Sequence, residues 1–214
     1  MACAAVVCLG LLAGGCAGEQ SEGAGGSGVI ISTPQDTSPY GGAEQRRYEL
    51  PDMTLTSASG ERFNLAADTD KPVTLVFFGY THCPDICPTT VAHVTQALRQ
   101  APESVQEKTQ FVFLTSDPAR DTPQRLREWL GRFNDSYIGL TGDLDKIEKV
   151  AKQLGVPLGG KQKKLPSGGY LVGHGAQVIA FGPDGQSRVL WTAGTSVGTL
   201  RDDIVQLVRT MAKA

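Results

Sequence analysis

The residues of this sequence best suited to chemistry are two cysteines, Cys83 and Cys87, in the segment CPDIC. A continuous apolar run, PVTLVFFGY at 72–80, precedes them, and a segment with helical periodicity follows. Cysteines four positions apart lie one turn apart on the same face of a helix, so their sulfurs can approach each other. The N-terminus of a helix also favours the thiolate over the thiol. The pair is therefore suited to a disulfide or to a shared metal ion.

Two thiolates without a cage of carboxylates are soft ligands, which select Cu(I) or Zn(II) over Ca(II) or Mg(II). A Cu(I) site needs a third ligand, and the sequence offers 3 histidines. His174 lies between two glycines, which let the backbone approach a site closely, and we expect its loop to return beside the cysteines. His82 adjoins Cys83 and should point away from it, and His93 falls on another face of the helix. His174 is therefore the predicted third ligand.

The elements expected around these residues alternate between strands and helices. Thr122 and Pro123 are typical of an N-cap and a first helical position, and Gly155 is placed to end a helix. Buried strands are predicted at 72–80 and 110–116, helices at 88–100, 122–133, 143–156 and 197–211, and a hairpin at 176–191. This order predicts a thioredoxin-like α/β fold, with a central mixed sheet flanked by helices. Residues 48–65 predict an added N-terminal β-hairpin.

Three acidic residues and one loop complete the predicted surroundings of the site. Asp85 is expected to start the helix after the cysteine pair, and Asp117 and Asp121 to serve turns and helix starts after the second central strand. The Gly- and Lys-rich segment at 157–169 predicts a mobile loop.

The N-terminal segment MACAAVVCLGLLAGGC contains an uncharged apolar run that is shorter than the ~20 residues of a membrane-spanning helix. Such a run is typical of a secretory signal. The small residues before Cys16 resemble the lipobox of bacterial lipoproteins, although no Lys or Arg precedes the run and Ala13 stands where Leu is more usual. We therefore predict a lipoprotein signal peptide at 1–15 and lipidation of Cys16. The expected location is the cell membrane of a bacterium, on its extracytoplasmic face, with ordinary secretion as the alternative.

Residues 16–45, rich in Gly, Ser and Pro, predict a flexible tether, and 46–214 predict the folded domain. If Cys16 carries lipid, Cys83 and Cys87 are the thiols that remain in the mature chain. A length of 214 residues, with 40% hydrophobic and 20% charged residues, fits one globular domain. The formal net charge of −2 offers no basic field for nucleic acid. We expect a monomer.

The segment FGYTHCPDICP at 78–88 resembles the signature of the Sco/SenC family of copper chaperones. The resemblance runs from about Tyr48 to the C-terminus and includes TSDPARDTP at 115–123, GLTGDLDKIEKVAKQLGV at 139–156 and VGHGAQVIAFGPDG at 172–185. It implies a thioredoxin fold that binds copper through Cys83, Cys87 and His174. Family members often carry Asp before the distal His, and this chain has Gly173, a departure that bears on how the imidazole is oriented.

The resemblance implies a copper metallochaperone for Cu(I), with Cu(II) also allowed because imidazole suits it. The implied partner is cytochrome c oxidase subunit II or another copper protein. The chain would deliver copper to the dinuclear CuA centre of the oxidase or reduce the cysteines of that centre beforehand. The alternative is an extracytoplasmic thiol-disulfide oxidoreductase that uses Cys83 and Cys87 and does not need His174. A thiol peroxidase is disfavoured, because Tyr80 stands where Thr is usual. We expect a metallochaperone rather than an enzyme, with reductase activity left open.

Overall fold

Two buried strands form the centre of the fold, as the apolar runs predict. The computed structural model describes residues 40–42, 47–164 and 169–211, without the side chains of 161–164. Every residue of β3 (Val73–Gly79) is buried, and so is nearly every residue of β4 (Thr109–Thr115). The two strands pair in parallel over their whole length. Burial on both faces explains why their sequences are continuously apolar.

β3 and β4 belong to a seven-stranded sheet with the order β2-β1-β5-β4-β3-β8-β9. β5 (Ile138–Thr141), which sequence analysis did not predict, pairs in parallel with β4. β8 (Val178–Phe181) and β9 (Ser187–Trp191) form the predicted hairpin, and β8 pairs antiparallel with β3. β1 (Thr54–Ser57) and β2 (Arg62–Asn64) form the predicted N-terminal hairpin, which joins the sheet through β5. The predicted mixed sheet with an added hairpin is therefore confirmed.

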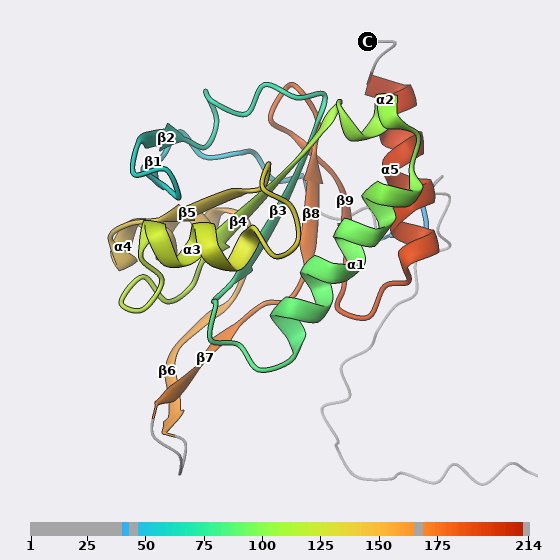
Figure 1. Cartoon of the computed structure of the whole chain (residues 1–214). Coiled ribbons are helices and arrows are strands. Elements are labelled where there is room, and N and C mark those ends of the chain that lie inside the picture. The colour runs from blue at the N-terminus through green and yellow to red at the C-terminus, as the bar shows by residue number, and fades with distance from the viewer. Residues whose placement is uncertain (1–39, 43–46, 165–168, 212–214) are drawn as a thin grey trace, which may run out of the picture. The chain divides into compact units, whose positions relative to one another are not determined.

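Helices cover both faces of this sheet (Figure 1). Leu75 and Phe77 of β3 share a core with α1 (Ile86–Gln100), α3 (Pro123–Leu130) and α5 (Val197–Met211). Val76 and Phe78 share the opposite core with α4 (Leu144–Gln153). Side chains alternate between the two cores along β3 because successive residues of a strand point to opposite faces. A short helix, α2 (Glu103–Gln106), was not predicted.

The ends of the helices follow the signals in the sequence with small shifts. The Thr122 hydroxyl accepts a hydrogen bond from the backbone N–H of Arg125 at 3.2 Å, and Pro123 is the first residue of α3, as predicted. Gly155, just after α4, adopts a φ of +64°, which favours glycine. α1 starts at Ile86, earlier than the predicted residue 88, so the second cysteine lies inside the helix.

The prediction of a loop at 157–169 is wrong for most of that segment. β6 (Leu158–Lys164) pairs antiparallel with β7 (Tyr170–His174), and the two strands form a separate two-stranded sheet. Figure 1 shows this hairpin extending away from the helices and the central sheet. The Gly- and Lys-rich sequence of β6 has a low β propensity and gives no strand signal. The strand forms because it pairs with β7.

Residues 40–42, which sequence analysis placed in the tether, lie against the folded domain. The backbone N–H groups of Gly41 and Gly42 donate to the carboxylate of Asp203 at 2.8 and 2.9 Å. The indole N–H of Trp191 donates to the same carboxylate at 2.7 Å. Asp203 is buried in α5, so these bonds satisfy a carboxylate that water does not reach.

The predicted signal peptide at 1–15, the lipidation site Cys16 and residues 17–39 of the predicted tether lie outside the described residues. None of the helices in the described ranges has the length and apolar character needed to cross a bilayer.

Candidate metal centre

Cys83 and Cys87 lie at the junction of β3 and α1. Cys83 is in the loop and half-buried, whereas Cys87 is in the first turn of α1 and fully buried. Both are free thiols. The backbone N–H of Cys87 donates to the sulfur of Cys83, with 3.3 Å between the two atoms. The start of the helix therefore stabilises negative charge on Cys83, as the position of the motif predicts.

His174 ends β7 and reaches the same place from the other side. Its Nε2 lies 3.1 Å from the sulfur of Cys87. The ring meets the aromatic rings of Phe77 and Tyr80 edge-on, at centroid distances of 6.1 and 5.7 Å. These contacts confirm that the segment carrying His174 returns beside the cysteines. They also surround the imidazole with apolar surface.

A backbone carbonyl sets the tautomer of His174. Its Nδ1 lies 2.9 Å from the carbonyl oxygen of Gly175, and a carbonyl only accepts, so Nδ1 carries the hydrogen. Nε2 of the neutral ring then has its lone pair free and directed toward Cys87. A hydrogen bond from the other ring nitrogen is how proteins orient histidine ligands of metals. The Gly175 carbonyl therefore orients the imidazole of His174.

The two thiols have different proton affinities. A hydrogen bond with the Cys87 side chain lowers the pKa of Cys83 to about 4. A hydrogen bond with His174 and the backbone of Asp85 and Cys87 add to the effect, against the opposing desolvation. The hydrogen bond between the two cysteine side chains, together with burial, raises the pKa of Cys87 well above its usual value. At neutral pH these shifts favour a thiolate at Cys83 and a thiol at Cys87.

The three side chains are close enough together that they could hold one metal ion. The two sulfurs and a ring nitrogen of His174 all lie within 4.8 Å of one another. Within the described ranges, no other group of three or more His, Cys, Asp or Glu residues is placed to hold a metal ion. The set contains no carboxylate, so it suits a soft ion rather than Ca(II) or Mg(II).

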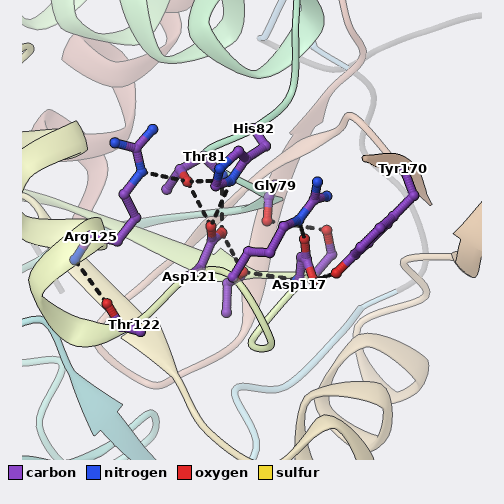
Figure 2. Close-up of polar contacts among 11 residues, drawn as sticks. Gly79, Thr81, His82, Asp117, Asp121, Thr122, Arg125 and Tyr170 are labelled. Carbon is purple, nitrogen blue, oxygen red and sulfur yellow. Dashed lines mark hydrogen bonds and ion pairs between the residues drawn. The ribbon is translucent and has the colours of Figure 1, made fainter. Parts of the chain in front are cut away.

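Asp121 holds the loop that precedes Cys83. Its carboxylate, which is fully buried, accepts hydrogen bonds from the backbone N–H and hydroxyl of Thr81 at 3.0 and 2.7 Å. It accepts a third from the hydroxyl of Thr115 at 2.7 Å. Figure 2 shows Asp121 directed toward Thr81 and His82. The helix-start role expected near this position belongs to Thr122, and Asp121 instead ties the cysteine loop to the end of β4.

The remaining polar residues of the motif lie outside the ligand set. His82 is 42% exposed in its side chain, and its Nδ1 is 3.2 Å from the Thr81 hydroxyl. His93 is half-buried on α1 and does not join the cluster, as predicted. Asp85 is exposed at the position before α1, where its backbone carbonyl accepts from the N–H of Thr89 at 3.2 Å. It therefore starts the helix, as expected.

Arg120 and Tyr170 lie beside the site, although sequence analysis gave them no role. The guanidinium carbon of Arg120 is 3.7 Å from the ring centroid of Tyr170 and 5.6 Å from that of Tyr80. These residues come from the loop after β4, from β7 and from the cysteine loop. No local pattern reveals such a contact, because its members are far apart in the sequence.

Comparison with known proteins supports the resemblance seen in the motifs. The family model described as SCO1/SenC matches residues 42–209. A candidate copper-binding protein of Stutzerimonas stutzeri is 40% identical over 143 residues, which cover 67% of this chain and 69% of that protein. The mitochondrial protein SCO2 of Saccharomyces cerevisiae is 36% identical over 138 residues, 60% of this chain and 46% of that protein. The chain therefore spans about half the length of the mitochondrial relative.

Solved structures match the fold over most of the domain. The copper-bound structure of ScoI from Arabidopsis thaliana matches with a TM-score of 0.68 and 28% identity, over 75% of this chain and 98% of that one. The copper-bound structure of ScoI from Bradyrhizobium japonicum matches with a TM-score of 0.66 and 29% identity, over 74% and 99% of the two chains. These matches confirm the predicted thioredoxin-like fold. The chain belongs to the SCO1/SenC family.

Proposed function

We propose that the chain binds copper through Cys83, Cys87 and His174 and works as a copper metallochaperone. The observation that carries this proposal is the placement of two sulfurs and one oriented imidazole within 4.8 Å of one another. Thiolate and imidazole ligands suit copper, as Cu(I) and also as Cu(II). The similarity to two copper-bound ScoI structures supports copper as the cargo.

The three ligands differ in how a partner could reach them. Cys83 is half-buried, whereas Cys87 is fully buried. An acceptor protein therefore meets the copper ion on the Cys83 side, and its thiolates replace the ligands of this chain one at a time. A low pKa at Cys83 keeps that sulfur ready to bind copper without first losing a proton.

The proposed partner is another copper protein, and the family resemblance specifies the CuA centre of cytochrome c oxidase subunit II. The chain would deliver copper there or reduce the cysteines of that centre beforehand. We further propose that lipid on Cys16 anchors the chain to the extracytoplasmic face of a bacterial membrane. The predicted tether at 16–45, of which residues 40–42 lie against the domain, would join it to the domain at 46–214. The support for this anchor is the lipobox-like sequence before Cys16. We propose a monomer.

The test is a titration of the reduced full chain in detergent with Cu(I) against a competing chelator. The native chain should bind one tight equivalent. Changes outside the ligand set of metal sites cost about 10- to 100-fold in affinity, so His174→Ala, which removes a ligand, should cost at least about 100-fold. His93→Ala is the matched control, because His93 lies on α1 outside the cluster. Binding that is absent, or indifferent to His174, would overturn the proposal.

The lowered pKa of Cys83 beside the raised pKa of Cys87 favours a second candidate function, that of a thiol-disulfide oxidoreductase. The Cys83 thiolate would attack a disulfide of the substrate and form a mixed disulfide, releasing one substrate thiolate. Cys87 would then resolve it, leaving a Cys83–Cys87 disulfide and a fully reduced substrate. Turnover of a model disulfide in the presence of a reductant measures this activity. An enzyme of this kind should keep its rate in the His174→Ala variant, and a rate no higher than that of the reductant alone would exclude it.

A further inference from the structure

The strand that carries His174 is not part of the central sheet. β7 pairs with β6 in a sheet of their own, with register shifts along the pair. Cys83 and Cys87 are held by β3 and α1, and Val172 of β7 is buried in the same core cluster. Contacts other than pairing within the central sheet must therefore fix the distance between His174 and the two sulfurs.

Tyr170 begins β7 and lies on the same face of the strand as His174. Side chains alternate along a strand, so residues four positions apart point to the same side. The Tyr170 hydroxyl donates to the carboxylate of Asp117 at 2.8 Å. Figure 2 shows Tyr170 reaching from its strand to Asp117. Because Asp117 is buried just after β4, this bond ties the start of β7 to the central sheet.

Arg120 joins Tyr170 to the loop of the cysteines. It forms an ion pair with Asp117, and its guanidinium lies 3.7 Å from the ring centroid of Tyr170. The same group lies 5.6 Å from the ring centroid of Tyr80, whose ring meets His174 edge-on. A continuous series of contacts therefore leads from Tyr170 through Arg120 and Tyr80 to the imidazole.

The guanidinium of Arg120 is only partly hydrogen-bonded. Its Nε donates to the carboxylate of Asp117, whereas its Nη2 is buried and has no hydrogen-bond partner among the described residues. A desolvated cation over an aromatic face gains more than an exposed one does. The carboxylate of Asp117 balances its charge. These features indicate that the loop after β4 holds Arg120 between the two tyrosines.

We propose that Arg120 and Tyr170 are positioning residues, which clamp the β6–β7 hairpin so that His174 stays within reach of the two cysteines. This inference rests on the proposed copper function. Neither residue touches the metal in this scheme, and both act through the imidazole. Loss of the clamp would leave the copper ion on the two sulfurs, with His174 engaged only part of the time.

The test is a double-mutant cycle on copper affinity, with the reduced full chain in detergent and Cu(I) competed by a chelator. Tyr170→Ala and Arg120→Lys are each made in the native chain and in the His174→Ala chain. We expect each to weaken binding about tenfold in the native background, as changes around metal ligands do, and to have no effect when His174 is absent. Tyr170→Phe keeps the ring on Arg120 and loses the hydroxyl that donates to Asp117, so it should bind copper more tightly than Tyr170→Ala.

Two further measurements separate positioning from a loss of fold. Arg188→Lys is the matched control, because Arg188 pairs with Asp184 in the β8–β9 hairpin and should not affect copper. Electron paramagnetic resonance of the Cu(II) form should show the nitrogen coupling of His174 in the native chain, a weaker coupling in Tyr170→Ala, and none in His174→Ala. If Tyr170→Ala does not fold, Arg120→Lys carries the test.

Three outcomes would overturn the inference. Equal losses of affinity with and without His174 would show that the clamp acts on the fold and not through the imidazole. If Tyr170→Ala and Arg120→Lys kept the native copper affinity and the native nitrogen coupling, the proposed clamp would be refuted. The proposed copper function would remain. If His174→Ala itself left copper binding unchanged, the proposed function and this inference would both fall.

Discussion

Nε2 of His174 lies 3.1 Å from the sulfur of Cys87, although the two residues are 87 positions apart in the chain. The thiol comes from a helix of the main core and the imidazole from a separate hairpin. The carbonyl of Gly175 keeps the free lone pair of the ring directed at the sulfur. Residues from two separate parts of the fold therefore meet at one place.

The lowered pKa of Cys83 predicts an unusual reactivity profile in the metal-free, reduced protein. A pKa of about 4 means that the thiolate is present above about pH 4 and is lost as the pH falls through that value. Alkylation of Cys83 by iodoacetamide should therefore be nearly constant from about pH 6 to 8. A thiol with an ordinary pKa of about 8.5 would instead speed up nearly tenfold per pH unit.

Cys87→Ala tests the cause of this effect. The side chain of Cys87 is the main source of the lowered pKa, so its removal should raise the pKa of Cys83 and make the rate depend on pH. Cys87 itself should resist alkylation, because it is buried and its pKa is raised. Peptide mapping of the alkylated chain distinguishes the two sites. A native rate that rises steadily up to pH 8 would contradict the assignment of the thiolate to Cys83.

Asp121→Asn should destabilise the domain. The buried carboxylate accepts hydrogen bonds from donors of Thr81 and Thr115, and an amide would present its own N–H groups to some of them. A buried donor left without a partner costs about 1–3 kcal/mol, so the free energy of unfolding should fall by about that amount in urea titrations. Asp70→Asn, at an exposed position, is the control and should change stability by less than about 0.5 kcal/mol. Equal effects at the two positions would refute this role of Asp121.

Gly42→Ala should displace residues 40–42 from the domain. A Cβ atom there would lie 2.4 Å from a methyl carbon of Val189 and 2.7 Å from the indole of Trp191. The fluorescence of Trp191 should change, and stability should fall by about 1–3 kcal/mol, as overpacking does. Gly198→Ala makes the same change in α5, where the nearest atom is 3.8 Å away, and should not lower stability. Native fluorescence in Gly42→Ala would show that the segment does not pack there.

Thr122→Ala should cost about 0.5–2 kcal/mol of stability, because it removes the hydroxyl that caps α3. Thr122→Ser keeps the acceptor and serves as the control. Urea unfolding of the two variants measures the difference. If both lost the same stability, the methyl group of Thr122 would matter and the cap would not.

The elements that sequence analysis predicted well are those whose signals are local. The two central strands are long apolar runs, and α3 starts with a Thr122–Pro123 signal that needs no tertiary context. β5 was missed because IGLT is too short and too mixed to show a period, and its pairing with β4 forms it. β6 was missed for a similar reason, since its partner β7 supplies the hydrogen bonds that its Gly- and Lys-rich sequence does not favour.

The ligand set could be predicted because it depends on residue type and on the order of elements. The supporting contacts could not. Asp121 reaches back to Thr81, and Arg120 lies between two tyrosines from different parts of the chain. The carbonyl of Gly175 has no side-chain signature at all. Residues that orient a ligand are fixed by tertiary packing, and their spacing in the sequence follows no period.

Because β6 and β7 form a separate sheet, His174 differs from the two cysteines in how much of the fold must open before it can move away from them. The two strands bond to each other, so the hairpin can swing away without breaking a ladder of the seven-stranded sheet. Opening of one such unit costs less free energy than unfolding of the whole domain. Cys83 and Cys87 stay on the main core during this motion. Under the proposed function, His174 could therefore leave a bound ion by local opening of one hairpin, while the rest of the domain stays folded.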